Sequence, residues 1–566
     1  MAALAAMVGI VAGFGAIGFR YLLDFIQAVS YGSAGNMMEA VESNHWYIRI
    51  LIPAAGGLIV GPIVYFFARE AKGHGVPEVM EAVALKQGVI RKRVVFVKSI
   101  ASALSISTGG SVGREGPIVQ IGSAIGSTTG QVLGLSYDRV RTLVGCGAAA
   151  GIAATFNAPI AGSMFALEIV LGDFGLATFS PIVISSVMAT AVSRHFLGDM
   201  PAFVVPAYKL VNGFELPLYM ILGLFCALTA AAFTRTLYLF EDLYKRLKIP
   251  EYLKAMTGGF LIGCIGLEFP HLLGVGYPAM DLALTQNLGL WTMLVLILCK
   301  ILATSVTIGS GGSGGIFAPS LFIGAMAGGF FGSVVHTVLP GVTASPGAYS
   351  IVGMAAVVSG TTHGPLSAIL ILFEMTGDYK IILPLMITCI ISTHASRRLL
   401  SDSIYTLKLA RRGINLKAGK EINVLKSIPV KNVMNRDVES IMESMSLGDM
   451  AEKILKSKNN SFPVVNHKGF LTGVLSFYDY QDAIFDEDLK DLIVAKDIAT
   501  SNVTTVEQDD NLYDAFEKIS GKDYSILPVV SSEEPDRLQG VLTRRDIISA
   551  YNKAVIKKSV FEEKNI

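Results

Sequence analysis

The chain has 566 residues, of which 52% are hydrophobic and only 16% are charged, and its formal net charge is +1. This composition is too apolar for an ordinary soluble enzyme, and the balanced charge argues against a nucleic-acid-binding surface or an acidic tail. Five cysteines stand singly in apolar runs, without the spacing of a metal or redox site. Most of the chain is therefore expected to lie in lipid.

Apolar runs follow one another through the first 400 residues, near 2–23, 48–67, 94–104, 142–171, 181–191, 216–233, 256–265, 290–306, 318–335, 348–372 and 381–391. Several are shorter than the roughly twenty residues of a simple span, and short helices are tolerated where their ends line a polar cavity. Met1 opens into the first run without a basic leader, so we expect no cleavable signal peptide. The alternatives for this first helix are that it is complete or that further residues precede it. Basic clusters at 91–93, 139–141, 397–398 and 411–412 predict the cytoplasmic side.

Residues 111–117 place Arg114 and Glu115 between glycines in an otherwise apolar region. Glycines let backbone N–H groups turn toward a ligand, and Pro117 suits the first turn of a helix. Free amides and the macrodipole make a helix N-terminus attractive to anions. A carboxylate there can take the place of an anion and leave it when protonated, so Glu115 is a candidate gate. The alternative is a salt bridge with Arg114, which adjacency makes geometrically awkward.

The same device recurs about two hundred residues later, where a glycine-rich stretch at 311–315 leads to Pro319. Aligning Pro117 with Pro319 also aligns the isoleucine and glycines that follow each proline. A second echo pairs Pro159, followed by Glu168, with Pro365, followed by Glu374 at the same distance. The membrane region is therefore predicted to consist of two related halves, and glycine- and proline-interrupted segments at matching places point to a transporter's binding site.

Three separated signatures, with Tyr405 after the last apolar run, resemble the CLC family of chloride channels and chloride/proton exchangers. They are Gly73-His74-Gly75-Val76-Pro77-Glu78, Gly113-Arg114-Glu115-Gly116-Pro117 and Gly315-Ile316-Phe317-Ala318-Pro319. The resemblance covers residues 1–415. It implies a polytopic α-helical membrane protein of two inverted-repeat halves, the CLC fold, forming a multi-pass homodimer in the cell membrane with one chloride pathway per subunit.

The resemblance also implies an anion site. Glu115 is expected to be the gating glutamate, and the backbone amides of Ile316 and Phe317 to hold the central anion. Amides suit this task because they offer partial positive charge without trapping the ion. The Tyr405 hydroxyl is expected to meet the anion from the cytoplasmic side, the alternative being an interfacial aromatic anchor. The implied anion-binding set is His74, Gly75, Arg114, Glu115, Gly116, Ile316, Phe317 and Tyr405.

Two positions depart from the pattern of the family. His74 stands where a serine is common, and its ring could donate an N–H, become charged near neutral pH or point away, which leaves the anion preference open. Ile169 stands where proton-coupled members typically carry an internal proton-relay glutamate, and isoleucine cannot relay a proton. Glu168 is turned away by roughly 100° on a helix, and its echo Glu374 suggests a structural role in both halves. We therefore expect channel-like passive conduction; the alternative is a chloride/proton antiporter that uses another internal route.

The chain after residue 427 contains its own repeat, over about 433–484 and 498–551, preceded by a linker at 416–427. Each copy has a Pro-Val-Val strand, then Gly-Val-Leu and Ser/Thr-x-x-Asp opening a helix. Residues 428–566 thus resemble a tandem CBS pair, a cytoplasmic α/β domain that in many proteins binds adenine nucleotides such as ATP, ADP or AMP. The residues so implied are Pro463, Ser476, Asp479, Pro528, Thr543 and Asp546. The alternatives are a helix start with Ser476 or Thr543 as N-cap, and a dimer platform.

Two other classes of protein fit the sequence less well. CBS pairs are also fused to intramembrane metalloproteases, but these need His-Glu-x-x-His, which none of the eight histidines supplies. A divalent-cation transporter would need clustered membrane carboxylates, whereas glycine-rich helix starts favour anions. We expect no enzyme activity, no metal site, no required cofactor and no nucleic-acid partner; the expected partners are chloride or other small anions, lipid and a second copy of the chain.

Overall fold

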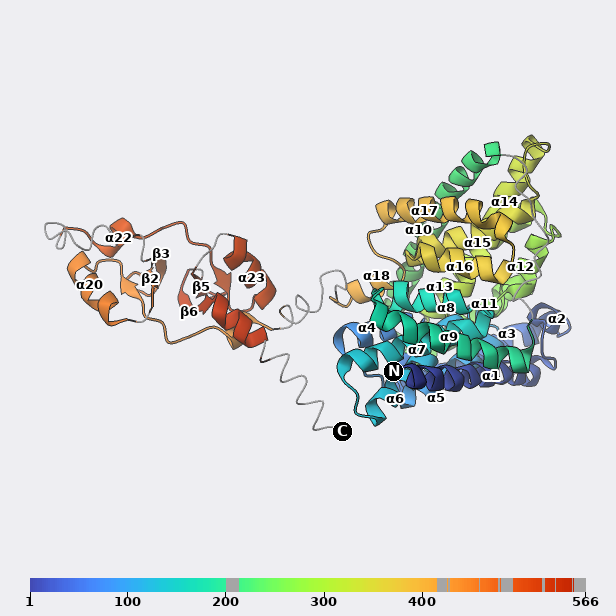
Figure 1. The fold of residues 1–566 in the computed structure, drawn as a ribbon, viewed down its shortest axis with the longest axis horizontal. Coiled ribbons are helices and arrows are strands. Elements are labelled where there is room, and N and C mark those ends of the chain that lie inside the picture. Colours follow the sequence, from blue (N-terminus) through green and yellow to red (C-terminus); the bar gives the residue numbers. More distant parts are fainter. Residues whose placement is uncertain are drawn as a thin grey trace. The chain divides into compact units, whose positions relative to one another are not determined.

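The structure is a computed structural model that describes residues 1–199, 213–414, 425, 428–457, 459–476, 479, 492–521, 525–534, 536–551 and 553. Internal contacts divide the chain into two compact units, Met1–Gly413 and Ile414–Ile566. The membrane unit is helical and the tail unit combines short strands with helices (Figure 1).

The membrane unit runs through two comparable series of helices, drawn from blue to teal and from green to orange in Figure 1. The first series is α1 (Ala2–Tyr31), α2 (Met37–Glu42), α3 (Trp46–Phe67), α4 (Val76–Leu85), α5 (Arg93–Ser107), α6 (Glu115–Val132), α7 (Tyr137–Phe156), α8 (Pro159–Phe165) with the π-helical η2 (Ala166–Leu171), and α9 (Leu176–Leu197). The second is α10 (Leu216–Arg246), α11 (Glu251–Glu268), α12 (Tyr277–Leu284), α13 (Leu290–Gly309), α14 (Phe317–Val338), α15 (Pro346–Thr362), α16 (Pro365–Thr376), α17 (Ile382–Leu399) and α18 (Thr406–Ala410). Seven helices of the described chain are long and apolar enough to cross a membrane, namely α1, α3, α9, α10, α13, α14 and α17 with the turn before it.

Two apolar runs that hydropathy alone would join are each broken into two helices. Asn157 ends α7 and His363 ends α15, both in the left-handed region with φ of 57° and 58°. Pro159 and Pro365 then open α8 and α16, and the residue before a proline is driven out of the helical region. The same break at matching places leaves the short helices α8 and α16, one in each half.

The two halves meet closely where α3 crosses α11. A Cβ on Gly57 would lie 2.2 Å from the Ala255 carbonyl oxygen, and a Cβ on Gly259 would lie 2.0 Å from that of Pro53. Gly61 and Gly263 repeat the arrangement one turn further along, against Tyr252 and Ile50. Each helix therefore brings a Gly-x-x-x-Gly pair to the crossing, which lets two backbones approach as side chains would not permit.

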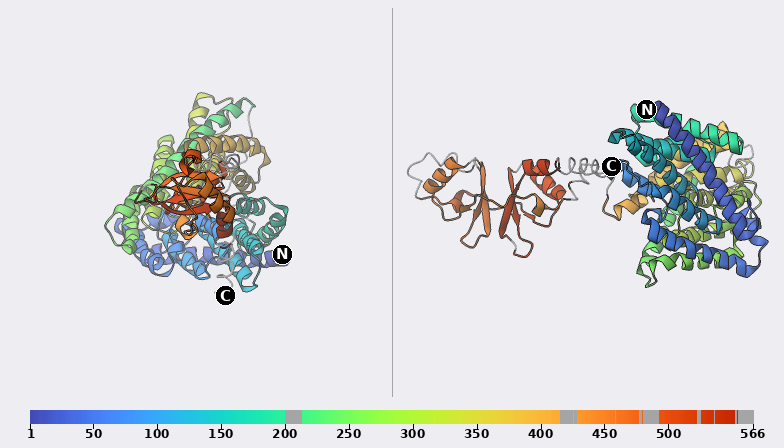
Figure 2. Two further views of the ribbon diagram at one scale, coloured as in Figure 1. Left: turned by 90° about the vertical axis from the view of Figure 1, so that its left-hand side faces the viewer. Right: turned by 90° about the horizontal axis from the view of Figure 1, so that it is seen from below.

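The tail unit contains the predicted repeat as two three-stranded sheets. β1 (Ile441–Met442), β2 (Ser461–Val465) and β3 (Leu471–Ser476) form one sheet, and β4 (Val506–Glu507), β5 (Ile526–Val530) and β6 (Leu538–Thr543) form the other. In both, the first pair of strands is parallel, the second antiparallel, and the register shifts at the last Val of Pro-Val-Val. The strands of the two repeats lie side by side in the right-hand view of Figure 2, and Figure 1 labels the helices around them, α20 (Leu447–Lys456), α22 (Ala495–Ile498) and α23 (Leu512–Gly521).

Candidate functional site

The signature loops of both halves are joined by backbone hydrogen bonds at one buried junction. Gly113 and Gly315 exchange two of them, N–H to carbonyl oxygen, at 2.7 and 2.6 Å. Gly73 donates to the Gly312 carbonyl at 3.2 Å and accepts from the Gly314 N–H at 3.3 Å. Loops more than two hundred residues apart in the sequence therefore form one backbone framework.

Glycine is required where this framework is tightest. A Cβ on Gly116 would lie 2.2 Å from the His74 carbonyl oxygen, and one on Gly315 would lie 2.7 Å from the Gly116 nitrogen. Contacts that short do not occur for real side chains, so the loops could not meet if either position carried one. The glycines of the motifs are thus explained by the close approach of loop to loop.

Three helices begin at the junction, and none has a side-chain N-cap. α4 follows Gly75, α6 follows Arg114 and α14 follows Ile316, and no side-chain cap hydrogen bond forms at these three positions. The first N–H groups of a helix have no partner within it, and the macrodipole adds positive potential there. Converging uncapped N-termini make this junction suited to an anion or a carboxylate.

Glu115 supplies that carboxylate. It is 1% exposed, and its Oε1 accepts a hydrogen bond from the Tyr277 hydroxyl at 3.0 Å. Its Oε2 is buried and lies against the backbone N–H groups at the start of α14, that of Ala318 among them. The place that a Cβ on Gly113 would take lies 2.2 Å from this Oε2 and 3.2 Å from the Ala318 nitrogen, which puts the carboxylate against the first turn of α14.

No ion pair joins Arg114 to Glu115 among the residues described, although the Arg114 charge still stabilises the ionised carboxylate. The Arg114 guanidinium lies over the ring of Tyr277, 5.2 Å from its centroid. Arg114 and Tyr277 line a cavity of about 410 Å³ beside α1 and α12. The wall of this cavity also includes Asp24 and Asp281. The salt-bridge alternative for this pair is therefore wrong.

His74 and Tyr405 lie together from opposite ends of the membrane unit. They are 2% and 1% exposed, and their ring centroids are 5.8 Å apart. The His74 Nδ1 is buried with no hydrogen-bond partner in the described part of the chain. Ile316 and Phe317 are both 1% exposed, and the Phe317 ring packs on Phe156. Tyr405 is thus a buried residue, unlike an aromatic anchor at a membrane surface.

Ile169 lies in η2, 7% exposed, with its side chain against Gly364. The neighbouring Glu168 accepts hydrogen bonds from Leu366 N–H at 3.1 Å and from the N–H and hydroxyl of Ser367, both at 2.7 Å. Glu374 reciprocates, accepting from the N–H groups of Ile160 and Ala161 at 3.0 and 2.6 Å. Each glutamate caps a short helix of the other half, which confirms the predicted structural role.

Two buried lysines that sequence reasoning missed hold the loops in place. Lys98 donates to the carbonyl oxygens of Ala71 and Gly73 at 3.0 and 2.8 Å, and Lys300 donates to those of Leu272 and Gly274 at 3.0 and 3.4 Å. Both side chains are fully buried. Their sequence separation equals that of Pro117 and Pro319, so the repeat alignment contained the signal.

An ionic cluster ties the end of the membrane unit to α4. Lys408 on α18 pairs with Glu78 at 2.8 Å, and Arg412 pairs with Glu78 and Glu81 at 3.3 and 3.1 Å. The Lys408 and Glu78 side chains are each only 10% exposed. The short segment that carries Tyr405 is therefore fixed by charge to α4, the helix that follows His74 and Gly75.

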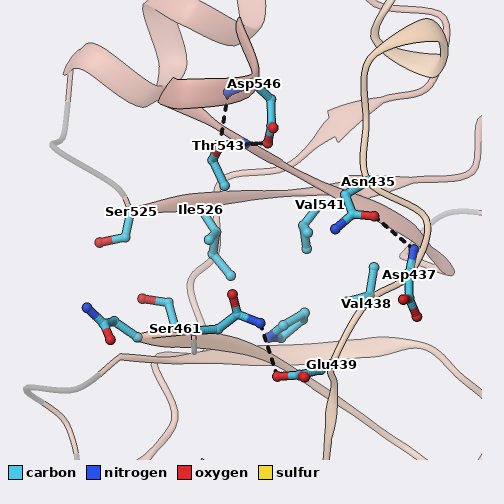
Figure 3. Close-up of a pocket in the computed structure, with 13 residues that line it drawn as sticks. Asn435, Asp437, Val438, Glu439, Ser461, Ser525, Ile526, Val541, Thr543 and Asp546 are labelled. Carbon is cyan, nitrogen blue, oxygen red and sulfur yellow. Dashed lines mark hydrogen bonds between the residues drawn. The ribbon is translucent and has the colours of Figure 1, made fainter. Parts of the chain in front are cut away.

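The tail unit contains a cavity of about 240 Å³ between its two repeats (Figure 3). It is lined by Asn435, Asp437, Val438, Glu439, Asn459, Asn460, Ser461, Pro463, Ser525, Ile526, Val541, Thr543 and Asp546. Pro463, Thr543 and Asp546 of the implied nucleotide set are in this lining, and Ser476, Asp479 and Pro528 are not.

In both Ser/Thr-x-x-Asp motifs the aspartate accepts hydrogen bonds from the Ser or Thr, and in the second motif the pair opens a helix. Asp546 Oδ2 accepts from the Thr543 N–H and hydroxyl at 3.0 and 2.6 Å, and Thr543 Oγ1 accepts from the Asp546 N–H at 3.1 Å. Asp479 Oδ2 accepts from Ser476 in the same way, at 2.6 and 2.7 Å. Since these bonds use Oδ2, the capping role and a ligand contact through Oδ1 are compatible.

The structure is that of a multi-span membrane protein whose two repeated halves meet at one buried junction. Uncapped helix N-termini surround a carboxylate there, an arrangement suited to binding an anion. Residues 56–397 match the family model for the voltage gated chloride channel, and residues 430–486 and 495–553 each match that for the CBS domain. The chain therefore belongs to the voltage gated chloride channel family, the CLC family, and carries two CBS domains at its C-terminus. The predicted family and fold class are confirmed.

Some relatives are named as chloride channels and others as chloride/proton exchangers. A putative chloride channel protein ClcB-like from Ralstonia nicotianae is 36% identical over 73% of this chain and 97% of its own length. The H(+)/Cl(-) exchange transporter ClcA of Vibrio parahaemolyticus is 32% identical over 72% of this chain and 89% of its own. The crystal structure of a slow cyanobacterial Cl-/H+ antiporter superposes with a TM-score of 0.67 at 27% identity, covering 73% of this chain and 97% of that one. The family is one of chloride transport and not of enzymes.

Proposed function

We propose that this protein conducts chloride passively across the cell membrane and that protonation of Glu115 opens the path. The observation that carries this proposal is the buried Glu115 carboxylate among the uncapped N-termini of α4, α6 and α14. An ionised carboxylate competes with chloride for the same amides. A neutral one loses that attraction and yields the place.

The remaining anion contacts are proposed from the same junction. The amides of Ile316 and Phe317 at the start of α14 hold the central chloride, with Gly75 and Gly116 allowing the backbone to approach. Tyr405 and His74 close the site together, as their adjacent rings suggest. Arg114 contributes positive potential beside the gate.

Passive conduction is preferred because neither Ile169, at the relay position, nor its neighbour Glu168 is equipped to carry a proton. Ile169 has no titratable group, and Glu168 is engaged in three hydrogen bonds at the start of α16. A chloride/proton antiporter is the second candidate. It is favoured by His74, a buried titratable ring beside Tyr405 whose Nδ1 has no partner in the described structure, and which could replace the missing relay.

The gate is tested by chloride efflux from proteoliposomes over a range of pH. Wild type should conduct more as pH falls, because protonation removes the competing charge, and Glu115→Gln should conduct at every pH with a flat profile. Glu42→Gln, which removes an exposed carboxylate from α2, is the control and should keep the wild-type profile. A wild-type profile in Glu115→Gln would remove Glu115 from the gate.

We infer that the CBS pair binds an adenine nucleotide in the cavity of Figure 3 and so regulates the pore. Hydrogen bonds from Ser457 and Asn459 lower the pKa of Glu439, so this carboxylate in the cavity wall is ionised at neutral pH. With Asp437 and Asp546 it makes the described lining acidic, which suits ribose hydroxyls better than phosphates. The nucleoside end of the ligand is therefore expected to lie there.

We further propose that the protein is a homodimer with one complete pathway in each subunit and with its CBS domains in the cytoplasm. Both halves of the signature set lie within one chain, so a second subunit is not needed to complete the junction. Arginines at 397–398 and 411–412, after the last membrane helix, support a cytoplasmic start of the tail.

A further inference from the structure

Tyr277 is carried by a turn that repeats, in the second half, the turn carrying His74. Gly274-Val275-Gly276-Tyr277-Pro278 matches Gly73-His74-Gly75-Val76-Pro77 residue for residue in its glycines and proline. Gly75 and Gly276 precede α4 and α12 with φ of 83° and 89°. The two buried lysines bind equivalent carbonyl oxygens in the two turns. Tyr277 therefore takes the place of Val76, as the first residue of its helix.

This placement brings the Tyr277 hydroxyl to the gating carboxylate. The hydroxyl donates to Glu115 Oε1 at 3.0 Å across 162 residues of sequence, and the Arg114 guanidinium lies over the ring. Tyr277 also lines the cavity of about 410 Å³, so it stands between that cavity and Glu115. A hydrogen bond to an ionised group is shorter and stronger than one between neutral groups, so this contact depends on the charge of Glu115.

The charged and titratable groups around Glu115 come from several elements. They are Arg114 on its own turn, Tyr277 and Asp281 on α12, Asp24 on α1 across the cavity, and His74 and Tyr405 on the side of α4 and α18. Of these, Tyr277 alone has a hydrogen bond to the carboxylate among the described contacts. The Tyr277 hydroxyl also interacts with the Arg114 guanidinium, so its removal leaves Arg114 with the ring contact alone.

We propose that Tyr277 is a positioning residue for the gate, whose hydroxyl holds the ionised Glu115 carboxylate in the path and releases it on protonation. The proposal rests on the proposed role of Glu115. Because the hydrogen bond favours the ionised, closed form, its loss makes protonation easier, and the gate then opens at a higher pH. A tyrosine that merely fills space would leave the pH of opening unchanged.

The test compares pH profiles of chloride efflux from proteoliposomes for wild type and Tyr277→Phe, which keeps the ring over which Arg114 lies. The half-activation pH should rise by about one unit or more, the shift expected for the loss of a hydrogen bond to a charged group. Tyr31→Phe removes another buried hydroxyl, bonded to the Thr108 carbonyl oxygen at 3.0 Å, and should keep the wild-type profile. An unchanged half-activation pH in Tyr277→Phe would overturn the inference.

Two further variants separate this inference from the proposed function. Glu115→Gln should give a flat profile, and the double variant Glu115→Gln/Tyr277→Phe should match it, because no ionisable carboxylate remains to be held. If Glu115→Gln keeps the wild-type profile, the proposed gate itself fails. If Glu115→Gln is flat but the double variant restores a pH dependence or changes the flux severalfold, Tyr277 acts by another route and the inference fails alone.

Discussion

At the scale of single residues, Glu168 and Glu374 connect the two halves of the membrane unit. Each accepts backbone N–H groups at the start of a short helix in the opposite half, α16 for Glu168 and α8 for Glu374. The exposed amides of a helix start inside a membrane have no water to bond, so these carboxylates satisfy groups that would otherwise be costly to bury.

Glu168→Ala should therefore lower the stability of the protein in detergent, with a loss of about 1–2 kcal/mol typical of removing a helix cap. Glu374→Ala, its repeat partner, should lower it similarly, as measured by thermal or chemical unfolding. The chloride efflux of each folded variant should keep its pH dependence. Unchanged stability of both variants would contradict the capping role of the two glutamates.

The sequence predicted which residues meet at the site better than how they are held there. His74, Glu115, Ile316 and Tyr405 were predicted together because the motifs of the family contain them, and they lie at one junction. Tyr277 was missed because it is distant in sequence from Glu115 and its turn carries Tyr where the first half has Val. Sequence symmetry alone does not show which of two equivalent turns touches the carboxylate.

At the scale of elements, the crossing of α3 and α11 depends on glycine. The helices touch backbone to backbone through two Gly-x-x-x-Gly pairs, so any side chain at the crossing must separate them. Because one helix comes from each half, this crossing helps to set how the halves fit together.

Gly259→Ala should destabilise the protein by about 1–3 kcal/mol, because the new Cβ would lie 2.0 Å from the Pro53 carbonyl oxygen. Gly18→Ala is the matched control: it lies in α1 with nothing within 4 Å of the new Cβ, and alanine there should be neutral or stabilise by up to about 1 kcal/mol. Unfolding of both variants in detergent gives the comparison. Equal stability of the two would show that the crossing tolerates separation.

Hydropathy predicted where most helices lie but not how they cross. The separations of Gly57 from Gly259 and of Gly61 from Gly263 equal that of Pro117 from Pro319, so the repeat alignment could have indicated the crossing. The sequence analysis did not predict the π-helical geometry of η2. In the tail, residues 415–424 and 480–491 lie outside the described residues, and the predictions for the linker and the end of the first repeat stay predictions.

At the scale of the whole molecule, the tail offers a ligand cavity on one side of its internal repeat. Asp546→Ala should weaken ATP, ADP or AMP binding to the full-length protein at least tenfold, as measured by calorimetry. Asp479→Ala removes the equivalent carboxylate, which bonds Ser476 as Asp546 bonds Thr543 but does not line the cavity, and should leave the affinity unchanged. Equal effects of the two substitutions would indicate a structural role for both. Any nucleotide that alters flux must bind the two states of the pore unequally.

A homodimer with independent pathways makes a second prediction at this scale. Cross-linked dimers with one wild-type and one Glu115→Ala subunit should show one pathway with the wild-type pH dependence and one without it, in single-molecule or low-density liposome recordings. Loss of the wild-type component together with the variant one would show that the subunits share a gate.

The central claim is that chloride moves without coupled protons, and one measurement tests it most directly. An outward or inward chloride gradient is imposed on proteoliposomes with the membrane potential clamped, and proton movement is followed with a pH-sensitive dye. Passive conduction through a path whose relay position is Ile169 predicts chloride flux with no uphill movement of protons. Reproducible uphill proton movement that is abolished by Glu115→Gln would contradict the account and make the protein a chloride/proton exchanger.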